Sequence, residues 1–228
     1  SPRFDVVLSL AADLSKKNRM DDVTNLVLAN SWLPAFLGTL AAKSEAHVIH
    51  IGTYSHKSDI SNFDPQTFYA ASKRTGELFL RFLTENTSIS ATVLHTYDIY
   101  GPRQPHQRVI PSIVSSLRAG ETIAISPGKQ EFRPVFVDDL VKLLECMITD
   151  SKQNVGRFRE YDVYGPELFK VEDLPKVIAS NMGFDLNQVR VEKRLSYADK
   201  EIMKFRPCHS LPPYPVIRTR LSDGLKFL

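Results

Sequence analysis

Apolar runs rich in β-branched residues alternate with amphipathic segments along the first hundred residues. This pattern predicts buried strands at 4–11, 48–51 and 91–97, and helices at 21–43, disturbed near Pro34, and at about 67–84. Buried strands that alternate with helices are typical of a parallel sheet with helices on both faces. Because the first strand starts so close to Ser1, we expect a sheet that lacks its first strands.

After residue 101 the alternation becomes less regular. We expect helices at 109–119, 139–148, 171–181 and 221–228, short strands at 122–126 and 135–137, and an extended proline-rich tail at 207–216. Asp138 or Asp139 is expected to cap its helix, and Gly183 to end another. The pattern therefore predicts a sheet domain at 1–105 and a smaller α/β lobe at 106–228, with 134–150 returning to the main sheet.

Composition narrows the function classes. The chain of 228 residues is 43% hydrophobic and 24% charged, as globular proteins are, and its net charge of +3 does not indicate nucleic-acid binding. The two cysteines form no C-x-x-C pair, so neither a zinc site nor a disulfide framework is expected, and we predict no metal. With no signal peptide and no run near eighteen apolar residues, we expect a cytoplasmic protein without a membrane partner.

Glycine spacing carries more information. No two of the ten glycines are closer than eight positions, whereas a G-x-G-x-x-G turn or a Walker loop needs glycines two to five residues apart. Both phosphate-binding loops are therefore excluded from these residues.

Tyr69-Ala70-Ala71-Ser72-Lys73 is a Y-x-x-x-K motif on a predicted helix. Positions i and i+4 share one helix face, so the phenol and the ammonium project together. A free tyrosine titrates near a pKa of about 10, and an adjacent cation lowers that pKa toward neutrality by stabilising the phenolate. The spacing thus suits a group that protonates a carbonyl or deprotonates an alcohol.

Two polar residues upstream of this motif, one after a predicted strand and one in a predicted helix, are further candidates. Thr53 follows the strand 48–51, at the carboxyl end where open α/β sheets bind ligands. Asn30 interrupts the apolar stretch NLVLANSWLPAFL, and a buried amide there needs a partner. Asn30 is either a satisfied core residue or part of a proton relay, and the residues alone leave both readings open.

The order of these motifs resembles the extended short-chain dehydrogenase/reductase family, which comprises NAD(P)-dependent sugar-nucleotide epimerases, dehydratases and reductases. The resemblance covers nearly the whole chain. The residues that carry it are Leu10-Ala11-Ala12, Asn30, Thr53, Tyr69-x-x-x-Lys73, Tyr100-Gly101-Pro102, Val109-Ile110-Pro111, Ser126-Pro127-Gly128-x-Gln130, Val137-Asp138-Asp139 and Leu221-Ser222-Asp223-Gly224-Leu225.

The resemblance implies a role for each site residue. Tyr69 is the general acid or base on the sugar oxygen, and Lys73 lowers its pKa and binds the nicotinamide ribose. Thr53 donates a hydrogen bond to the reacting oxygen, and Asn30 holds a water that links Lys73 to solvent. Backbone at Ala11 and Ala12 lines the cofactor, which is NAD or NADP. The resemblance further implies a Rossmann-like sheet at 1–105, a nucleotide-sugar lobe and a homodimer.

Departures from the family's pattern bear on which of the family's reactions we expect for this chain. The 4,6-dehydratases carry an acidic pair directly after the catalytic Thr, where this chain has Tyr54 and Ser55, so dehydration is rejected. Three further residues are candidate substrate ligands. Asp98 replaces an Asn before the Tyr-Gly-Pro turn. Arg133 lies one place beyond the family's diphosphate-binding Arg, and on a strand this shift points its side chain to the opposite face. Arg108 suits a diphosphate, because an Arg guanidinium matches the geometry of phosphate oxygens.

The segments HTYDIYGP and SPGKQ look most like reductases that make CDP-linked 3,6-dideoxysugars. We therefore favour an enzyme that reduces a nucleotide-linked 4-keto sugar, with a C4 epimerase as the alternative. A sheet without its first βαβαβ unit, on the order of 60 residues, also leaves open a non-catalytic remnant. The choice between NAD and NADP depends on residues of that unit.

Overall fold

The computed structural model describes residues 3–14, 20–56, 65, 67–104, 108–126, 128–150, 158–193 and 205–228. Within them the chain forms two compact units. The sheet unit comprises Ser1–Thr96, Leu144–Val163 and Arg206–Tyr214, and the lobe unit comprises Tyr97–Leu143, Tyr164–Phe205 and Pro215–Leu228.

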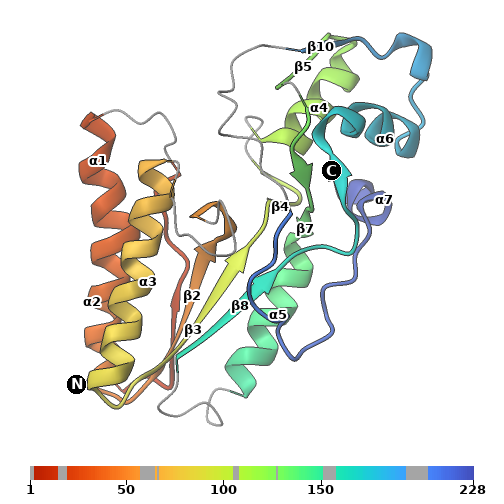
Figure 1. The fold of residues 1–228 in the computed structure, drawn as a ribbon. Coiled ribbons are helices and arrows are strands. Elements are labelled where there is room, and N and C mark those ends of the chain that lie inside the picture. The colour runs from red at the N-terminus through yellow and green to blue at the C-terminus, as the bar shows by residue number, and fades with distance from the viewer. Residues whose placement is uncertain are drawn as a thin grey trace. The chain divides into compact units, whose positions relative to one another are not determined.

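The sheet unit is built on four parallel strands in the order β1-β2-β3-β8 (Figure 1). These are β1 (Val6–Ser9), β2 (His47–Thr53), β3 (Ser90–Thr96) and β8 (Phe158–Val163). All seven residues of β3 are buried, as expected for a central strand. The predicted α/β fold with a parallel sheet is confirmed, although β8 was not foreseen because Arg159, Glu160 and Asp162 interrupt its apolar pattern.

Helices α2 (Leu33–Ala42) and α3 (Phe68–Asn86) pack on the sheet, and α1 (Met20–Val27) packs against α3 (Figure 1). A π-helical turn at Leu28–Trp32 joins α1 to α2 just before Pro34, where the sequence predicts a disturbance. Thr67 caps α3 by accepting a hydrogen bond from the Ala70 amide at 3.1 Å. By length and composition the continuous helix Met20–Ala42 is apolar enough to cross a membrane.

Gly76 explains how closely α3 approaches the π-helical turn. A Cβ atom at Gly76 would lie 2.3 Å from the carbonyl oxygen of Asn30, so any larger residue would push α3 away. This contact places the Y-x-x-x-K segment of α3 beside Asn30.

The lobe unit combines helices with three two-stranded sheets (Figure 1). Its helices include α4 (Val109–Ala119), α6 (Leu174–Asn181) and α7 (Leu221–Gly224). Its strand pairs are β5 (Ile123–Ile125) with β10 (Val191–Lys193), β6 (Glu131–Phe132) with β9 (Phe169–Lys170), and β4 (Ile99–Tyr100) with β7 (Val135–Phe136). The 3-10 turns are Tyr54–His56 in the sheet unit, and Val171–Asp173, Leu186–Gln188 and Leu225–Phe227 in the lobe. Aliphatic and aromatic side chains of α4 and α6 form its core.

Helix ends in the lobe were predicted only in part, since α6 begins at Leu174 rather than at 171 and α7 ends at Gly224 rather than at 228. Helix α4 has the predicted bounds, and Gly183 adopts a left-handed conformation just after α6. Helix α5 (Val137–Thr149) instead begins before the two aspartates that were expected to cap it. The capping role was wrong for Asp139, because its carboxylate accepts hydrogen bonds from the amides of Arg218 and Thr219.

Candidate active site

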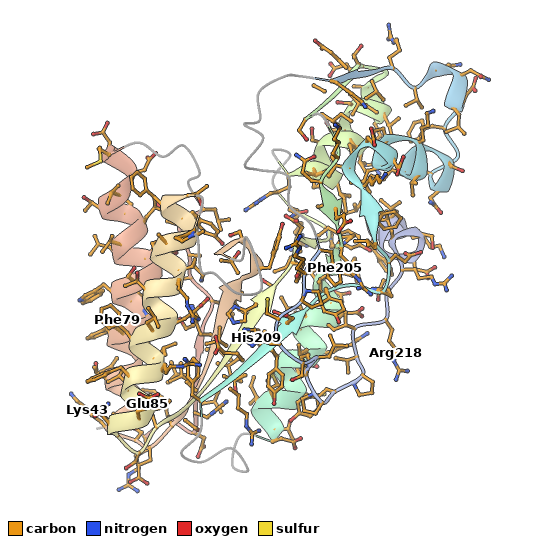
Figure 2. The ribbon with its side chains drawn as sticks, in the orientation of Figure 1. Lys43, Phe79, Glu85, Phe205, His209 and Arg218 are labelled. Atoms are coloured by element: carbon orange, nitrogen blue, oxygen red, sulfur yellow. The ribbon has the colours of Figure 1, made fainter. Side chains whose placement is uncertain are left out.

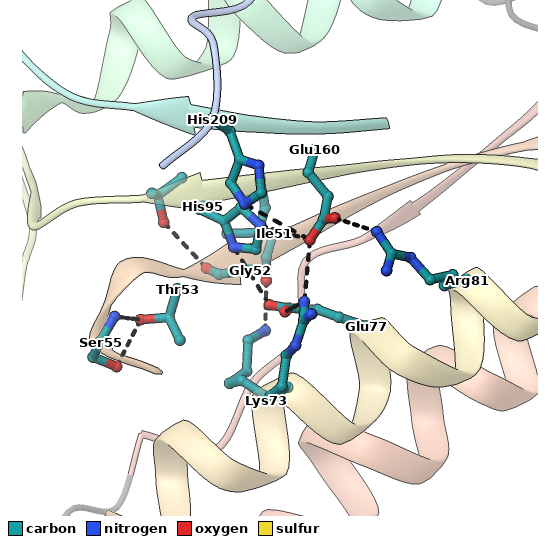
Figure 3. A network of polar contacts seen from close by, with 12 residues as sticks. Ile51, Gly52, Thr53, Ser55, Lys73, Glu77, Arg81, His95, Glu160 and His209 are labelled. Atoms are coloured by element: carbon teal, nitrogen blue, oxygen red, sulfur yellow. Dashed lines mark hydrogen bonds and ion pairs between the residues drawn. The ribbon is translucent and has the colours of Figure 1, made fainter. Parts of the chain in front are cut away.

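Helix α3 carries the Tyr–Lys pair at the carboxyl edge of the sheet. Tyr69 and Lys73 lie one helical turn apart, and both are buried, with exposed fractions of 8% and 2%. The Lys73 ammonium donates a hydrogen bond to the carbonyl oxygen of Ile51, two residues before Thr53 (Figure 3). Lys73 is therefore anchored to the end of β2.

Burial changes the acid–base behaviour of this lysine. Desolvation lowers the pKa of Lys73 to about 8, while the Glu77 carboxylate acts against this shift and raises it. At neutral pH the ammonium form thus persists despite burial, which is the form that stabilises a neighbouring phenolate.

Thr53 ends β2 and turns its hydroxyl toward the following residues (Figure 3). Its Oγ1 lies 2.9 Å from the Ser55 hydroxyl and accepts a hydrogen bond from the Ser55 amide at 3.2 Å. These contacts orient the Thr53 side chain, and its own hydroxyl proton can still be donated.

Asn30 is buried in the π-helical turn and its amide is engaged on both sides. Its Oδ1 accepts from the Asp13 amide at 3.0 Å, and its Nδ2 donates to the Asp13 carbonyl at 2.9 Å and to the Ser72 hydroxyl at 3.0 Å. Asn30 therefore ties the segment after β1 to α3 beside Lys73. The water-holding role implied by the family resemblance stays a prediction.

Ala11 and Ala12 follow β1 and are exposed, next to the Asp13 that Asn30 holds. Methyl side chains leave the backbone at this edge of the sheet accessible to a ligand. The residues present thus fit the nicotinamide half of a dinucleotide: an open backbone after β1, a hydroxyl after β2 and a buried ammonium between them and α3.

The three candidate substrate ligands belong to the lobe unit. The Asp98 carbonyl accepts from the Val135 amide at 2.9 Å, beside the β4–β7 pair, and Arg108 precedes α4 with extended backbone. Arg133 packs its guanidinium over the rings of Tyr164 and Phe205, at 4.3 and 4.5 Å. Its Nε also donates to the Gly165 carbonyl at 2.6 Å.

Arg133 is therefore partly committed to holding the lobe together, and fewer of its N–H groups remain for a phosphate than on a free side chain. Ligand roles for Asp98, Arg108 and Arg133 stay predictions.

A buried charge network behind Lys73 was missed by the sequence analysis (Figure 3). The Glu77 Oε1 atom lies 3.6 Å from His95 Nδ1, and His95 Nε2 lies 3.2 Å from Glu160 Oε1. Arg74 bridges both carboxylates at 3.1 Å. His209 Nε2 extends the network, 3.9 Å from the same Glu160 oxygen.

These contacts shift the two carboxylic acids in opposite directions. Burial raises the pKa of Glu77, against the charges of His95, Arg74 and Lys73. Burial also opposes ionisation of Glu160, yet the hydrogen bond and charge of His95, together with Arg74, hold its pKa at about 2. The i+4 spacing from Lys73 to Glu77 was a signal for part of this network, but nothing local links His209 to β3.

A parallel α/β sheet with a threonine at its carboxyl edge and a Tyr–Lys pair on the adjoining helix defines a chain of the short-chain dehydrogenase/reductase type. Residues 1–163 match the NAD dependent epimerase/dehydratase family, and the chain belongs to that family.

Two curated relatives are each 23% identical to this chain. One is "CDP-abequose synthase" of Yersinia pseudotuberculosis, over 75% of this chain and 60% of the relative. The other is "Low-salt glycan biosynthesis protein Agl12" of Haloferax volcanii, over 65% of this chain and 46% of the relative. The chain thus spans about half to three fifths of their lengths.

Solved structures show the same fold. The UDP-glucuronic acid 4-epimerase of Bacillus cereus, with UDP-glucuronic acid and NAD, has a TM-score of 0.80 at 20% identity, covering 98% of this chain and 73% of that one. The dTDP-glucose 4,6-dehydratase DesIV of Streptomyces venezuelae, a double mutant with NAD bound, has a TM-score of 0.76 at 19% identity, covering 97% and 70%.

Proposed function

We propose that the protein reduces a nucleotide-linked 4-keto sugar with a nicotinamide cofactor, NAD or NADP, and that Tyr69 is the general acid. The observation that carries this proposal is the buried Lys73, one turn from Tyr69 on α3 and hydrogen-bonded to the end of β2. When bound, that cofactor would supply the hydride for the carbonyl carbon. The chain's own residues then have to donate a proton to the carbonyl oxygen and stabilise the negative charge that develops on it.

Three side chains divide this work. Thr53 donates a hydrogen bond to the carbonyl oxygen, which stabilises negative charge as the carbon–oxygen double bond opens. Tyr69 transfers its phenolic proton to that oxygen, so a hydroxyl forms and a phenolate remains. The Lys73 ammonium stabilises that phenolate until solvent returns a proton. Backbone at Ala11 and Ala12 and the Lys73 ammonium would hold the nicotinamide half of the cofactor.

Two observations favour reduction over dehydration and epimerisation. Tyr54 and Ser55 follow Thr53 where a dehydratase needs an acidic pair. In addition, a CDP-abequose synthase is among the similar curated proteins, although the low identity does not transfer its substrate. The resemblance to a UDP-glucuronic acid 4-epimerase rests on the fold alone.

The test is a screen of the full-length protein against UDP-, dTDP-, GDP- and CDP-linked 4-keto sugars, with NADH and NADPH offered separately. We expect stoichiometric loss of reduced cofactor with a 4-keto sugar, and none in the Tyr69→Phe variant. Interconversion of sugars without net cofactor turnover would identify a C4 epimerase instead. A full-length protein that binds neither cofactor by calorimetry would identify a non-catalytic chain.

We also propose that the protein pairs with a second copy through the apolar face of α1, α2 and α3. Phe79 (Figure 2) is 46% exposed there and Trp32 is 53% exposed. Both side chains line a groove of about 460 Å³. Trp32 stacks on Phe36, also exposed, with ring centroids 5.0 Å apart. Continuous exposed aromatic surface of this kind is typical of an interface.

Light scattering after size-exclusion chromatography tests the pairing. We expect a dimer for the full-length protein and a monomer for Phe79→Lys, with Glu85→Lys on the same helix as the control. A monomeric wild type, or one that partitions into vesicles through Met20–Ala42, would contradict a second copy as the occupant.

A further inference from the structure

Glu77 is a fully buried carboxylate one helical turn after Lys73 that the proposed reaction does not use. Its Oε2 accepts a hydrogen bond from Arg74 at 3.1 Å. Its Oε1 faces the strand that carries Thr53, because a Cβ atom at Gly52 would lie only 2.7 Å from it. The carboxylate thus fits a space that exists only because residue 52 is glycine.

The surroundings of Glu77 come from three strands and the C-terminal tail (Figure 3). His95 of β3 lies 3.6 Å from Oε1, and Glu160 of β8 lies beyond it, held by Arg74 and by Arg81 at 2.8 Å. His209 closes the network, and the Asp162 carboxylate holds it by accepting from the His209 amide at 2.8 Å. His50 of β2 is a further buried titratable group near Lys73, and burial, together with the charge of Lys73, keeps the pKa of His50 well below its usual value.

Lys73 needs a negative group nearby, because a buried ammonium without one loses its proton. Burial lowers its pKa to about 8, and the charge that opposes this shift is that of Glu77. Arg74 and His95 also contact the Glu77 carboxylate, so the positions of both affect how strongly that carboxylate stabilises the Lys73 ammonium.

We propose that Glu77 is a positioning residue that keeps the Lys73 ammonium charged beneath Thr53, with its carboxylate held in place by the Arg74, His95, Glu160 and His209 network. This role rests on the proposed function, in which Lys73 acts on Tyr69. It adds to that function a carboxylate that sets the pH above which Lys73 loses its proton, and with it the upper pH limit of the reaction.

The same side chains do not form a metal site. His95, Glu160 and His209 offer ligand atoms within 4.8 Å of one another. However, the Arg74 guanidinium is 3.1 Å from the Glu160 oxygen that faces both imidazoles, and Arg81 holds the other oxygen at 2.8 Å. Two guanidinium cations already neutralise the carboxylate that a metal would need.

The direct test is the titration of Lys73 in the full-length protein without substrate, followed by the ¹³Cε chemical shift of labelled lysines and assigned with Lys73→Arg. We expect the Lys73 midpoint of Glu77→Gln to fall by about one pH unit relative to wild type, as the loss of a neighbouring opposite charge does. Glu85→Gln is the matched control, since Glu85 is exposed on the same helix (Figure 2). Its midpoint should equal that of wild type.

Arg74→Gln and the double variant Arg74→Gln/Glu77→Gln provide a second test, because they compare Lys73 with and without the Glu77 carboxylate when residue 74 carries no cation. We expect the Lys73 midpoint of the double variant to lie below that of Arg74→Gln. If Glu77→Gln alone does not fold, judged by far-UV circular dichroism, this comparison decides, and equal midpoints overturn the proposal. An unchanged midpoint in folded Glu77→Gln overturns it directly.

Kinetics separate this role from the proposed reaction. In an active protein, the alkaline limb of the kcat profile of Glu77→Gln should move to lower pH, with rates at pH 6 near those of wild type. A shifted Lys73 midpoint in a protein without activity would leave the positioning role standing and refute the reductase. If the protein is active but Glu77→Gln shifts neither the alkaline limb nor the Lys73 midpoint, the reductase stands and the positioning role is refuted.

Discussion

The two units differ in what they bury. Among the residues that the structure describes, every buried polar or charged residue except Asp139 belongs to the sheet unit. They include Lys73 and Glu77 on α3 and the histidines of β2 and β3. In the described part of the lobe, in contrast, the core cluster is apolar, and α4, α6 and the short strands contribute to it.

Carboxylates in the lobe unit have another task. Asp139 accepts hydrogen bonds from the amides of Arg218 and Thr219, and Glu167 accepts from the Leu221 amide at 2.7 Å. These contacts fix the C-terminal segment and leave no ionisable pair in the core of the described lobe. The comparison teaches that the sheet unit bears the free-energy cost of buried charge at the proposed site, whereas apolar packing stabilises the lobe core.

The largest expected effect is on activity alone. Tyr69→Phe removes the proton donor, so kcat should fall by about 10³-fold, a usual share for general acid catalysis. The free energy of unfolding should change by no more than about 1 kcal/mol, as for the loss of one hydrogen bond. Steady-state kinetics and urea titration measure the two. A fall in the free energy of unfolding large enough to account for the lost activity would show that Tyr69 is structural.

The matching change in the lobe should affect stability. Leu174 is fully buried in the apolar cluster, so Leu174→Ala should cost about 3 kcal/mol through lost burial and the cavity left behind. Hydrogen exchange should show the loss in amides of α4 and α6. Exposed Leu186→Ala, in the same unit, serves as the control and should change little. A cost below that of the control would mean that the cluster is not a core.

Acid should destabilise the sheet unit through its buried histidines. Burial, aided by Arg159, lowers the pKa of His47 to about 4 in the folded chain, against about 6.5 for an unperturbed histidine. Because the unfolded state binds the proton first, stability is lost as pH falls from 6.5 to 4, by up to about 3 kcal/mol.

Urea titrations followed by the fluorescence of Trp32, the single tryptophan, measure this loss in the sheet unit. His47→Gln should be less stable at pH 7 but should lose less stability than wild type between pH 6.5 and 4. An identical pH slope in both proteins would assign the acid sensitivity to other groups.

The smallest effect should come from Asp139→Asn. The amide keeps one acceptor oxygen and loses the charge, so the contacts to Arg218 and Thr219 weaken by about 1 kcal/mol. Faster hydrogen exchange at 218–224, with α6 unchanged, is the expected signature. Asp138→Asn, at the exposed neighbouring position, is the control and should leave exchange unaltered.

Local patterns were sufficient for the elements with regular periodicity. Helices α3 and α4 and strands β2 and β3 lie where the apolar spacing predicts them, because propensity, capping and burial agree there. Strand β8 and the lobe strands β4, β6, β9 and β10 were missed, since charged or isolated residues hide a period of two. Strands β5 and β7 lie within the strands predicted at 122–126 and 135–137.

The site divides in the same way. The Tyr69–Lys73 pair was predictable from sequence, because a helix brings positions i and i+4 to one face wherever it lies. The Asn30 contacts with Asp13 and Ser72 were left open, because they join residues 17 and 42 positions apart. His95, Glu160 and His209 come from two strands and the tail, and their proximity exists only once β3 pairs with β8.

The sequence by itself thus determined the fold class, the family resemblance and the residues on α3, since these depend on periodicity and spacing along one element. Only the tertiary structure decided what surrounds Lys73: the Ile51 carbonyl, the Glu77 carboxylate beneath Gly52 and the network behind it. The physical reason is that burial and neighbouring charge set the protonation of an ionisable group, and both are properties of contacts between distant segments.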